Sequence, residues 1–143
     1  MPFEVTKFEN HADKIAQMEK LAIQKTLTEI GMQAERHAKQ NCRDMDAVDT
    51  GLLRNSITFA LDGREANIGQ YKADKGSGSG SYSGTAPKEH GDNAAVYIGS
   101  NVEYAPYVEL GTSRMSPRPY LKNAVENYKD EYKAIIEKNM KNA

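Results

Sequence analysis

The chain is poor in residues on which several classes of protein depend. It has one cysteine, Cys42, and no tryptophan among its 143 residues. A single cysteine excludes an intramolecular disulfide and any zinc site built from several cysteines, and it suits a reducing compartment. The amino terminus lacks the order of basic, apolar and cleavage-site residues of a signal peptide, and no run approaches the roughly 18 apolar residues of a membrane span. We therefore expect a soluble protein without a classical signal peptide and without a membrane partner.

The chain also lacks an excess of charge of either sign. Its 19 Lys and Arg residues nearly cancel its 20 Asp and Glu residues, which leaves a net charge of -1. Binding of nucleic acid through counterion release needs a strong positive field, so no specific nucleic acid is expected as a partner. A local basic group at the end of the first predicted helix keeps a nucleic-acid-binding module as the alternative function, although the helix dipole favours cations there in any case. The group comprises Arg36, His37, Lys39 and Arg43.

Catalytic and metal-binding patterns are missing as well. The three histidines lie far apart, without the spacing of metal ligands, and no nucleophile motif surrounds Cys42. Glu103 and Glu109 are the remaining candidates for an acid/base pair, but six residues across a proline fix no geometry between them. We therefore predict no catalytic residue, no metal and no cofactor, and we do not expect an enzyme. A small hydrolase that uses the two glutamates is the competing hypothesis.

Two amphipathic helices are indicated by apolar residues at helical spacing. The first runs from about His11 to Asn41 without a proline, a length of about 45 Å that should cross the domain and overhang it. Gly31 within it predicts either a bend or a close approach of another backbone. The second runs from Tyr120 to about Met140. Its predicted apolar stripe consists of Leu121, Ala124, Val125, Tyr128, Tyr132, Ile135, Ile136 and Met140.

Alternating side chains predict two strands between these helices. Ser56–Leu61 and Ala94–Ser100 should pair antiparallel, and Asp62-Gly63 is a turn signal that allows a weak return strand over residues 66–69. Residues 64–93 are predicted to be a flexible Gly/Ser-rich insertion, because the tract from Gly76 to Gly84 has too little apolar surface to offset its ordering entropy.

These elements predict the fold class. We expect one α+β domain over residues 1–143, with a small antiparallel sheet packed against a long N-terminal helix and a C-terminal helix. The long flexible loop should lie at the tip of the sheet.

The densest group of turn-forming and aromatic residues lies between the second strand and the last helix. Pro106 should begin a short helical turn that ends at Leu110, because Gly111 can adopt the left-handed conformation that stops it. Tyr104 and Tyr107 within this junction are candidates for protein contacts, since tyrosine offers rigid area and one hydrogen bond.

Three blocks of the sequence resemble a known family. They are Asp49–Ile57 (DTGLLRNSI), Tyr97–Thr112 (YIGSNVEYAPYVELGT) and Pro117–Leu121 (PRPYL). They resemble the gene-product-ten-like minor morphogenesis proteins of long-tailed double-stranded-DNA phages and prophages, and their order and spacing match too. The resemblance covers nearly the whole chain except residues 64–93.

This resemblance implies a structural assembly protein that acts in head-tail joining or tail completion. Such a protein is a ring subunit at the neck or at the head-proximal end of the tail tube, with a hexamer as the expected form. The implied partners are copies of itself, connector or neck proteins and tail-tube proteins, and the implied location is the virion, with the host cytoplasm during assembly. Arg114 and Arg118 are expected to pair with carboxylates of a neighbour, or else to lie in a solvated loop. The predicted interface residues are Glu103, Tyr104, Tyr107, Glu109, Arg114 and Arg118.

Overall fold

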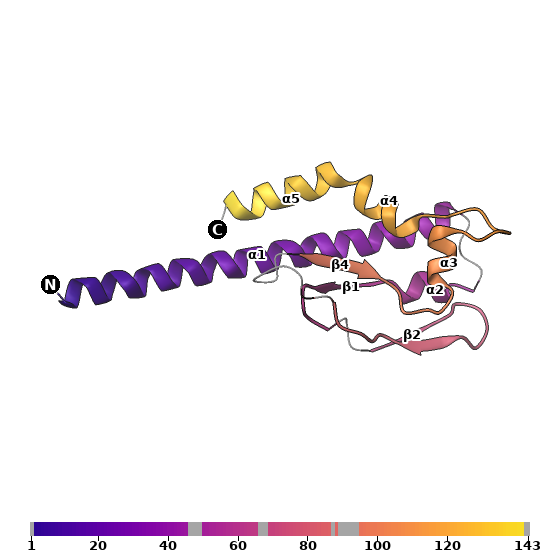
Figure 1. Ribbon diagram of the computed structural model, residues 1–143, viewed down its shortest axis with the longest axis horizontal. Coiled ribbons are helices and arrows are strands. Elements are labelled where there is room, and N and C mark those ends of the chain that lie inside the picture. The colour runs from indigo at the N-terminus through magenta and orange to yellow at the C-terminus, as the bar shows by residue number, and fades with distance from the viewer. Residues whose placement is uncertain (1, 46–49, 66–68, 87, 89–94, 142–143) are drawn as a thin grey trace.

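One helix, α1 (Pro2–Asp44), forms the middle layer of the molecule (Figure 1). The computed structural model describes residues 2–45, 50–65, 69–86, 88 and 95–141, and the side chains of α1 from Lys14 onward. The long helix is confirmed, but it begins at Pro2 and not near His11, and proline is well suited to a first helical position. Its 43 residues extend about 65 Å at 1.5 Å per residue.

A two-stranded antiparallel sheet lies along one side of α1. Its strands are β1 (Thr58–Leu61) and β4 (Val96–Gly99), with Phe59 opposite Ile98, so the predicted pairing is confirmed. Strand β1 starts two residues later than predicted, because Ser56 ends a short helix, α2 (Leu52–Ser56), that the sequence did not indicate. The Ser56 hydroxyl donates to the carbonyl oxygen of Leu53 at 2.6 Å and closes the last turn of α2.

Gly31 is the point where α1 crosses the sheet. A Cβ atom at this position would lie 2.5 Å from Cδ2 of Phe59 and 3.0 Å from Cγ2 of Val96. The close approach predicted at Gly31 is therefore present, but the approaching groups are side chains of the sheet and not another backbone. The absence of a side chain here allows α1 to rest directly on β1 and β4.

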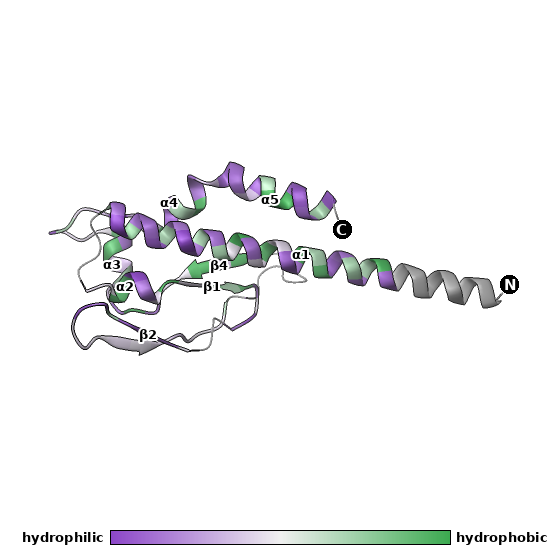
Figure 2. Cartoon of the chain, turned by 180° about the vertical axis from the view of Figure 1, so that it is seen from behind, coloured by the Kyte–Doolittle hydropathy of each residue, from purple (hydrophilic) through white to green (hydrophobic). Residues whose placement is uncertain are grey.

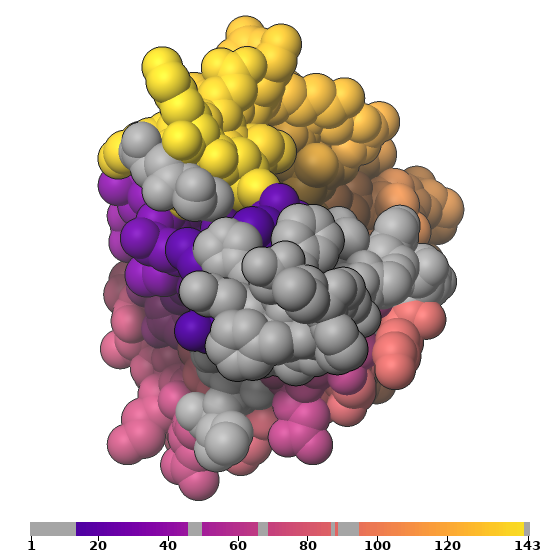
Figure 3. All heavy atoms as spheres, turned by 90° about the vertical axis from the view of Figure 1, so that its left-hand side faces the viewer, coloured from indigo at the N-terminus to yellow at the C-terminus, as the bar shows by residue number. Residues whose placement is uncertain are grey.

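The C-terminal helices cover the opposite side of α1. Helix α4 (Tyr120–Glu126) and helix α5 (Lys129–Lys141) replace the single predicted helix, and Figure 3 shows this layer end-on above α1 and the strand segments. The Tyr132 hydroxyl of α5 donates to the carbonyl oxygen of Ala124 in α4 and so bridges the interruption. Val125 and Ile136 do not belong to the buried stripe, because their side chains are 46% and 44% exposed.

The Gly/Ser tract forms part of a β-hairpin. Strand β2 (Gln70–Lys72) pairs antiparallel with β3 (Ser79–Ser81), below the sheet in Figure 1. Tyr71 of β2 is buried, and glycine at position 80 makes room for its ring, since a Cβ there would lie 2.6 Å from Cζ of Tyr71. The described part of segment 64–93 therefore contains ordered secondary structure, and its flexibility stays a prediction. The return strand expected over 66–69 falls mostly outside the described residues.

The main hydrophobic core gathers around the C-terminal end of α1. Cys42 lies within this core. Burial raises the pKa of its thiol to about 11, so the thiol is protonated at neutral pH. A smaller cluster joins α1 to α5 through Ile30, Ala34 and Tyr132. The main cluster consists of Ala38, Cys42, Leu53, Ile57, Tyr71, Val102, Ala105, Tyr120 and Ala124.

Among the described helices, none combines the length and apolar character that a membrane span requires. Hydropathy explains this, because hydrophilic and hydrophobic residues are interspersed along α5 and along the coloured part of α1 in Figure 2. Each helix is therefore amphipathic and has one face suited to packing against protein.

Candidate interaction surface

The predicted junction helix is present as α3 (Ala105–Leu110). Proline lies in its first turn, and the chain leaves it at Gly111, where φ is 78°. A Cβ atom at position 111 would lie 2.8 Å from the backbone nitrogen of Pro117 and 2.9 Å from the carbonyl oxygen of Met115. Both the left-handed backbone and the crowding require glycine, so Gly111 fixes the direction of the following loop.

The inner side of α3 is fixed to the core. Val102 and Ala105 are buried, and Tyr120 beneath them is fully buried. The Tyr120 hydroxyl donates to the carbonyl oxygen of Ala105 at 3.4 Å, while the side-chain amide of Asn41 in α1 donates to the carbonyl oxygen of Tyr120 at 3.1 Å. Burial raises the pKa of Tyr120, so its hydroxyl remains a donor over the physiological range. Helix α3 therefore has a rigid base.

The outer side of α3 carries large side chains in solvent. Tyr104, Tyr107 and Leu110 are 41%, 58% and 74% exposed. Their spacing of three residues places them along one side of the helical turn. We call these three residues the α3 surface. The two tyrosines were predicted as candidates for protein contacts, whereas Leu110 was predicted only as the end of the helical turn.

The charged residues predicted for this site have different environments. The Glu109 carboxylate accepts hydrogen bonds from the backbone N–H groups of Leu121 at 3.2 Å and Lys122 at 2.8 Å. It therefore caps α4, whose own first residue follows Pro119 and has no side-chain cap. Glu103 and Arg114 are exposed, and Arg118 is half-buried. Within the described parts of the chain, neither arginine side chain forms an ion pair.

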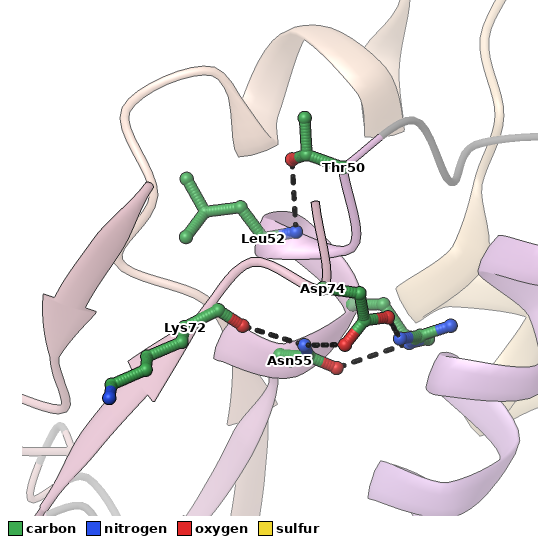
Figure 4. Close-up of polar contacts among 6 residues, drawn as sticks. Thr50, Leu52, Asn55, Lys72 and Asp74 are labelled. Carbon is green, nitrogen blue, oxygen red and sulfur yellow. Dashed lines mark hydrogen bonds and ion pairs between the residues drawn. The ribbon is translucent and has the colours of Figure 1, made fainter. Parts of the chain in front are cut away.

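The first motif block, from Thr50 to Ser56, holds the β2–β3 hairpin on the body (Figure 4). The Asn55 side-chain amide donates to the carbonyl oxygen of Lys72 at 2.7 Å and to Asp74 Oδ1 at 3.0 Å. The Arg54 guanidinium pairs with the other Asp74 oxygen. The carbonyl oxygen of Thr50 accepts from the backbone N–H of Asp74 at 2.7 Å. The hydrogen bond from Asn55 and the Arg54 charge hold the pKa of Asp74 below its usual range.

The second motif block ties the hairpin from its other end. The Tyr71 hydroxyl donates to the Asn101 side-chain oxygen at 2.6 Å, and the Asn101 amide donates to the carbonyl oxygen of Ser81 at 2.7 Å. The Tyr82 hydroxyl donates to the carbonyl oxygen of Asn55 at 2.7 Å. Two segments far apart in the sequence thus fasten one hairpin, and the side chains of Arg54, Asn55 and Asn101 act in internal structure.

A hollow of about 420 Å³ lies between the start of α2, the hairpin turn and Tyr104. It is lined by Leu52 and by the backbone of the Gly/Ser turn, and Tyr104 forms one wall. The hollow therefore adjoins the α3 surface. Together they offer a partner an exposed aromatic group next to a recess, which is the arrangement that binding hot spots use.

The predicted basic group at the end of α1 does not form a free basic face. The His37 ring is buried, lies 2.8 Å from a carboxylate oxygen of Glu131, and stacks on Tyr128 with ring centroids 3.5 Å apart. Lys39 lies 3.5 Å from Glu35, and Arg43 donates to Gln40 at 3.2 Å. His37 and Lys39 therefore face carboxylates of their own chain, whereas Arg36 and Arg43 are exposed. Over the described residues, no cluster of side chains suited to a metal ion is found.

Comparison with known families gives one match. The family model described as "Bacteriophage HK97-gp10, putative tail-component" matches residues 6–111. The match includes α1 from residue 6 onward, the first motif block, the second motif block up to Gly111 and all of α3, and it ends before the third motif block and α4. Neither the curated proteins nor the solved structures gave a match. Because the matched residues make up well over half of the chain, the protein belongs to the HK97-gp10-like family of bacteriophage tail components.

Proposed function

We propose that this phage tail protein acts in head-tail joining or tail completion, as a ring subunit at the neck or the head-proximal end of the tail tube. The observation that carries the proposal is the α3 surface, where three large side chains are exposed on a short helix with a fully buried base. Exposed apolar groups on a rigid support are typical of protein contact sites. The partners are further copies of the chain, connector or neck proteins and tail-tube proteins.

A ring requires a heterologous contact, in which the surface on one copy meets a different surface on the next. The α3 surface and its adjoining hollow lie at one end of the elongated molecule and supply one side of such a contact in this proposal. Glu103 and Arg114 are exposed beside them and provide charges that set the orientation of a neighbour. Arg118 is a partner for a neighbour's carboxylate, and Glu109 contributes through the α4 cap that supports this surface. Assembly takes place in the host cytoplasm, and the product is part of the virion.

The test is assembly with purified neck and tail-tube proteins, followed by electron microscopy. The double variant Tyr107→Ser/Leu110→Ser should retain its fold and fail to join the particle, because it removes exposed apolar area and leaves the base of α3 intact. The control is Val125→Ser, which removes a comparably exposed apolar side chain from α4. Normal incorporation of the double variant would contradict the proposal.

The nucleic-acid-binding alternative is less well supported. Within the basic group at the end of α1, His37 and Lys39 contact carboxylates of their own chain, which reduces the positive field that nucleic acid would meet there. Tight DNA binding by the isolated chain with a steep dependence on salt would favour this alternative.

A further inference from the structure

A second apolar surface lies on α1, far from the α3 surface. Ile15, Met18 and Met32 are 45%, 59% and 56% exposed, although they belong to a helix that is buried elsewhere. Figure 1 shows that α1 continues past the C-terminal end of α5, so within the described residues α5 does not cover this part of α1. The sheet occupies the opposite side of the helix, through Gly31 and Ala34.

The residues on this uncovered side follow a heptad pattern. Their spacings alternate between three and four residues, which is the repeat that places one helix along another. Leu21, which is 58% exposed, flanks them. We call this set the α1 seam: Ile15, Met18, Ala22, Lys25, Glu29, Met32 and Arg36.

Helix α5 forms a wall beside the C-terminal half of the α1 seam. A hollow of about 600 Å³ lies between the two helices, with Met32, Ala134 and Ile135 as its apolar lining and charged side chains at its rim. An additional helix placed in this hollow would contact α1 and α5 together. Ridge-and-groove packing of this kind needs a partner helix with its own narrow apolar stripe.

We propose that the occupant is α1 of a second copy of this chain, in an antiparallel pair with a two-fold axis near residue 27. The charges of Lys25 and Glu29 favour this antiparallel arrangement over a parallel one. Lys25 of each copy lies opposite Glu29 of the other, and Met18 lies along the aliphatic stem of the other copy's Arg36. Lys25 is exposed, and Glu29 is half-buried, with one carboxylate oxygen accepting a hydrogen bond from the Asn139 side chain at 3.1 Å and the other left for the neighbouring copy. A parallel pair in register would place Lys25 against Lys25 and Glu29 against Glu29, which is unfavourable.

The size of the contact is consistent with a stable dimer. From Ile15 to Met32 the seam extends about 26 Å along the helix, and the α5 wall adds to the area that each copy covers. The exposed apolar residues meet the small Ala22 or the stem of Arg36, so the helices are able to approach closely. Stable interfaces begin at roughly 1,200 Å² of buried surface, and a seam of this length flanked by a second helix has the necessary extent.

The experiment is sedimentation velocity of the purified full chain over a range of concentrations. The wild type should sediment as a dimer that dissociates on dilution, and Met18→Asp should sediment as a monomer. Lys25→Glu should raise the dimer Kd by about tenfold, since two ion pairs per dimer become two repulsions. The double reversal Lys25→Glu/Glu29→Lys should restore association, because it exchanges the partners without changing the pairing.

Two controls separate this contact from other effects. Circular dichroism checks that each variant retains its helices, and Tyr107→Ser/Leu110→Ser should leave the dimer intact because it alters only the α3 surface. A wild type that stays monomeric at high micromolar concentration would overturn the proposal, as would a double reversal that fails to recover. The α1 seam and the α3 surface are separate, so failure at one does not imply failure at the other.

Discussion

Gly80 shows how one position decides the structure of a region that composition marks as a linker. The Tyr71 ring fills the space that a side chain at position 80 would need, and the Tyr71 hydroxyl is held by Asn101 at 2.6 Å. Gly80→Ala should therefore lower the free energy of unfolding by about 1–3 kcal/mol, the usual cost of overpacking. Urea denaturation measures the change. Ser79→Ala on the exposed side of the same strand should stay within about 0.5 kcal/mol.

Cys42 should make stability sensitive to alkaline pH. Burial raises the pKa of its thiol to about 11 in the folded protein, above the ordinary value of 9.0 that the unfolded chain retains. The thiol's contribution is therefore fully present below pH 9 and is lost as the pH rises toward 11, with a limiting slope of about 1.4 kcal/mol per pH unit.

Urea unfolding at several pH values between 8 and 11 checks this prediction. Cys42→Ala should be less stable throughout, because it leaves a small cavity, but its stability should fall less steeply over this range. A fall should remain in Cys42→Ala above pH 10, because burial raises the pKa of Tyr132 from its ordinary value of 10.0 to about 12. Equal slopes for the two proteins would show that the thiol does not titrate as described.

At the scale of single residues, the sequence indicated the local role of a residue more reliably than the direction in which its side chain points. The stop at Gly111 and the exposure of Tyr107 were predictable because backbone freedom and amphipathic character belong to the residues themselves. The outward direction of Leu110 was not, since it depends on Tyr120 and Ala105 already filling the space beneath α3.

Helix α4 gives a matched pair of neighbouring positions. Ala124 is fully buried, whereas Val125 is 46% exposed. Ala124→Asp should unfold the domain or cost several kcal/mol, because it buries an unpaired charge. Val125→Asp should be tolerated, and thermal unfolding followed by circular dichroism compares the two. A larger loss of stability in Val125→Asp than in Ala124→Asp would contradict this assignment of the buried side of α4.

Among the elements, those with a periodic pattern or a clear start and stop signal were predictable, and α2, β2 and β3 were not. Helix α1 and the pairing of β1 with β4 follow from periodicity. Helix α2 has only five residues and leaves no periodic signal. The interruption between α4 and α5 was hidden because Ala124, Tyr128 and Tyr132 keep a spacing of four residues across it, which reads as one continuous helix.

At the scale of the whole molecule, the hairpin is attached to the body by the buried Tyr71 ring and by a few polar contacts. Asn101→Ala removes the acceptor of the Tyr71 hydroxyl and the donor to Ser81 together. We expect the first proteolytic cuts in this variant to fall within residues 69–86, while the body built on α1 persists. Limited proteolysis with mass spectrometry locates the cuts. Cuts that fall first in the sheet or in α5 would show that the hairpin is not the weakest unit.

The overall architecture was predictable as a class, and the placement of the candidate site was predictable only in part. The α+β fold and the junction followed from local patterns and from the family resemblance. The role of Asn55 and Asn101 in fastening the hairpin was not predictable, because it joins segments separated by many residues and depends on a hairpin that composition argued against.

Serine and glycine alternate over residues 77–81, and this alternation determines which substitutions the segment should tolerate. Serines 77, 79 and 81 are exposed, whereas Gly78 and Gly80 are partly covered by Leu52 and Tyr71. A saturation library over residues 77–81 should therefore show tolerance with a period of two, with polar replacements accepted at the serines and few accepted at Gly80. Masking of low-complexity sequence would remove these residues from a comparison of homologous chains, and with them strand β3, which carries the period of two.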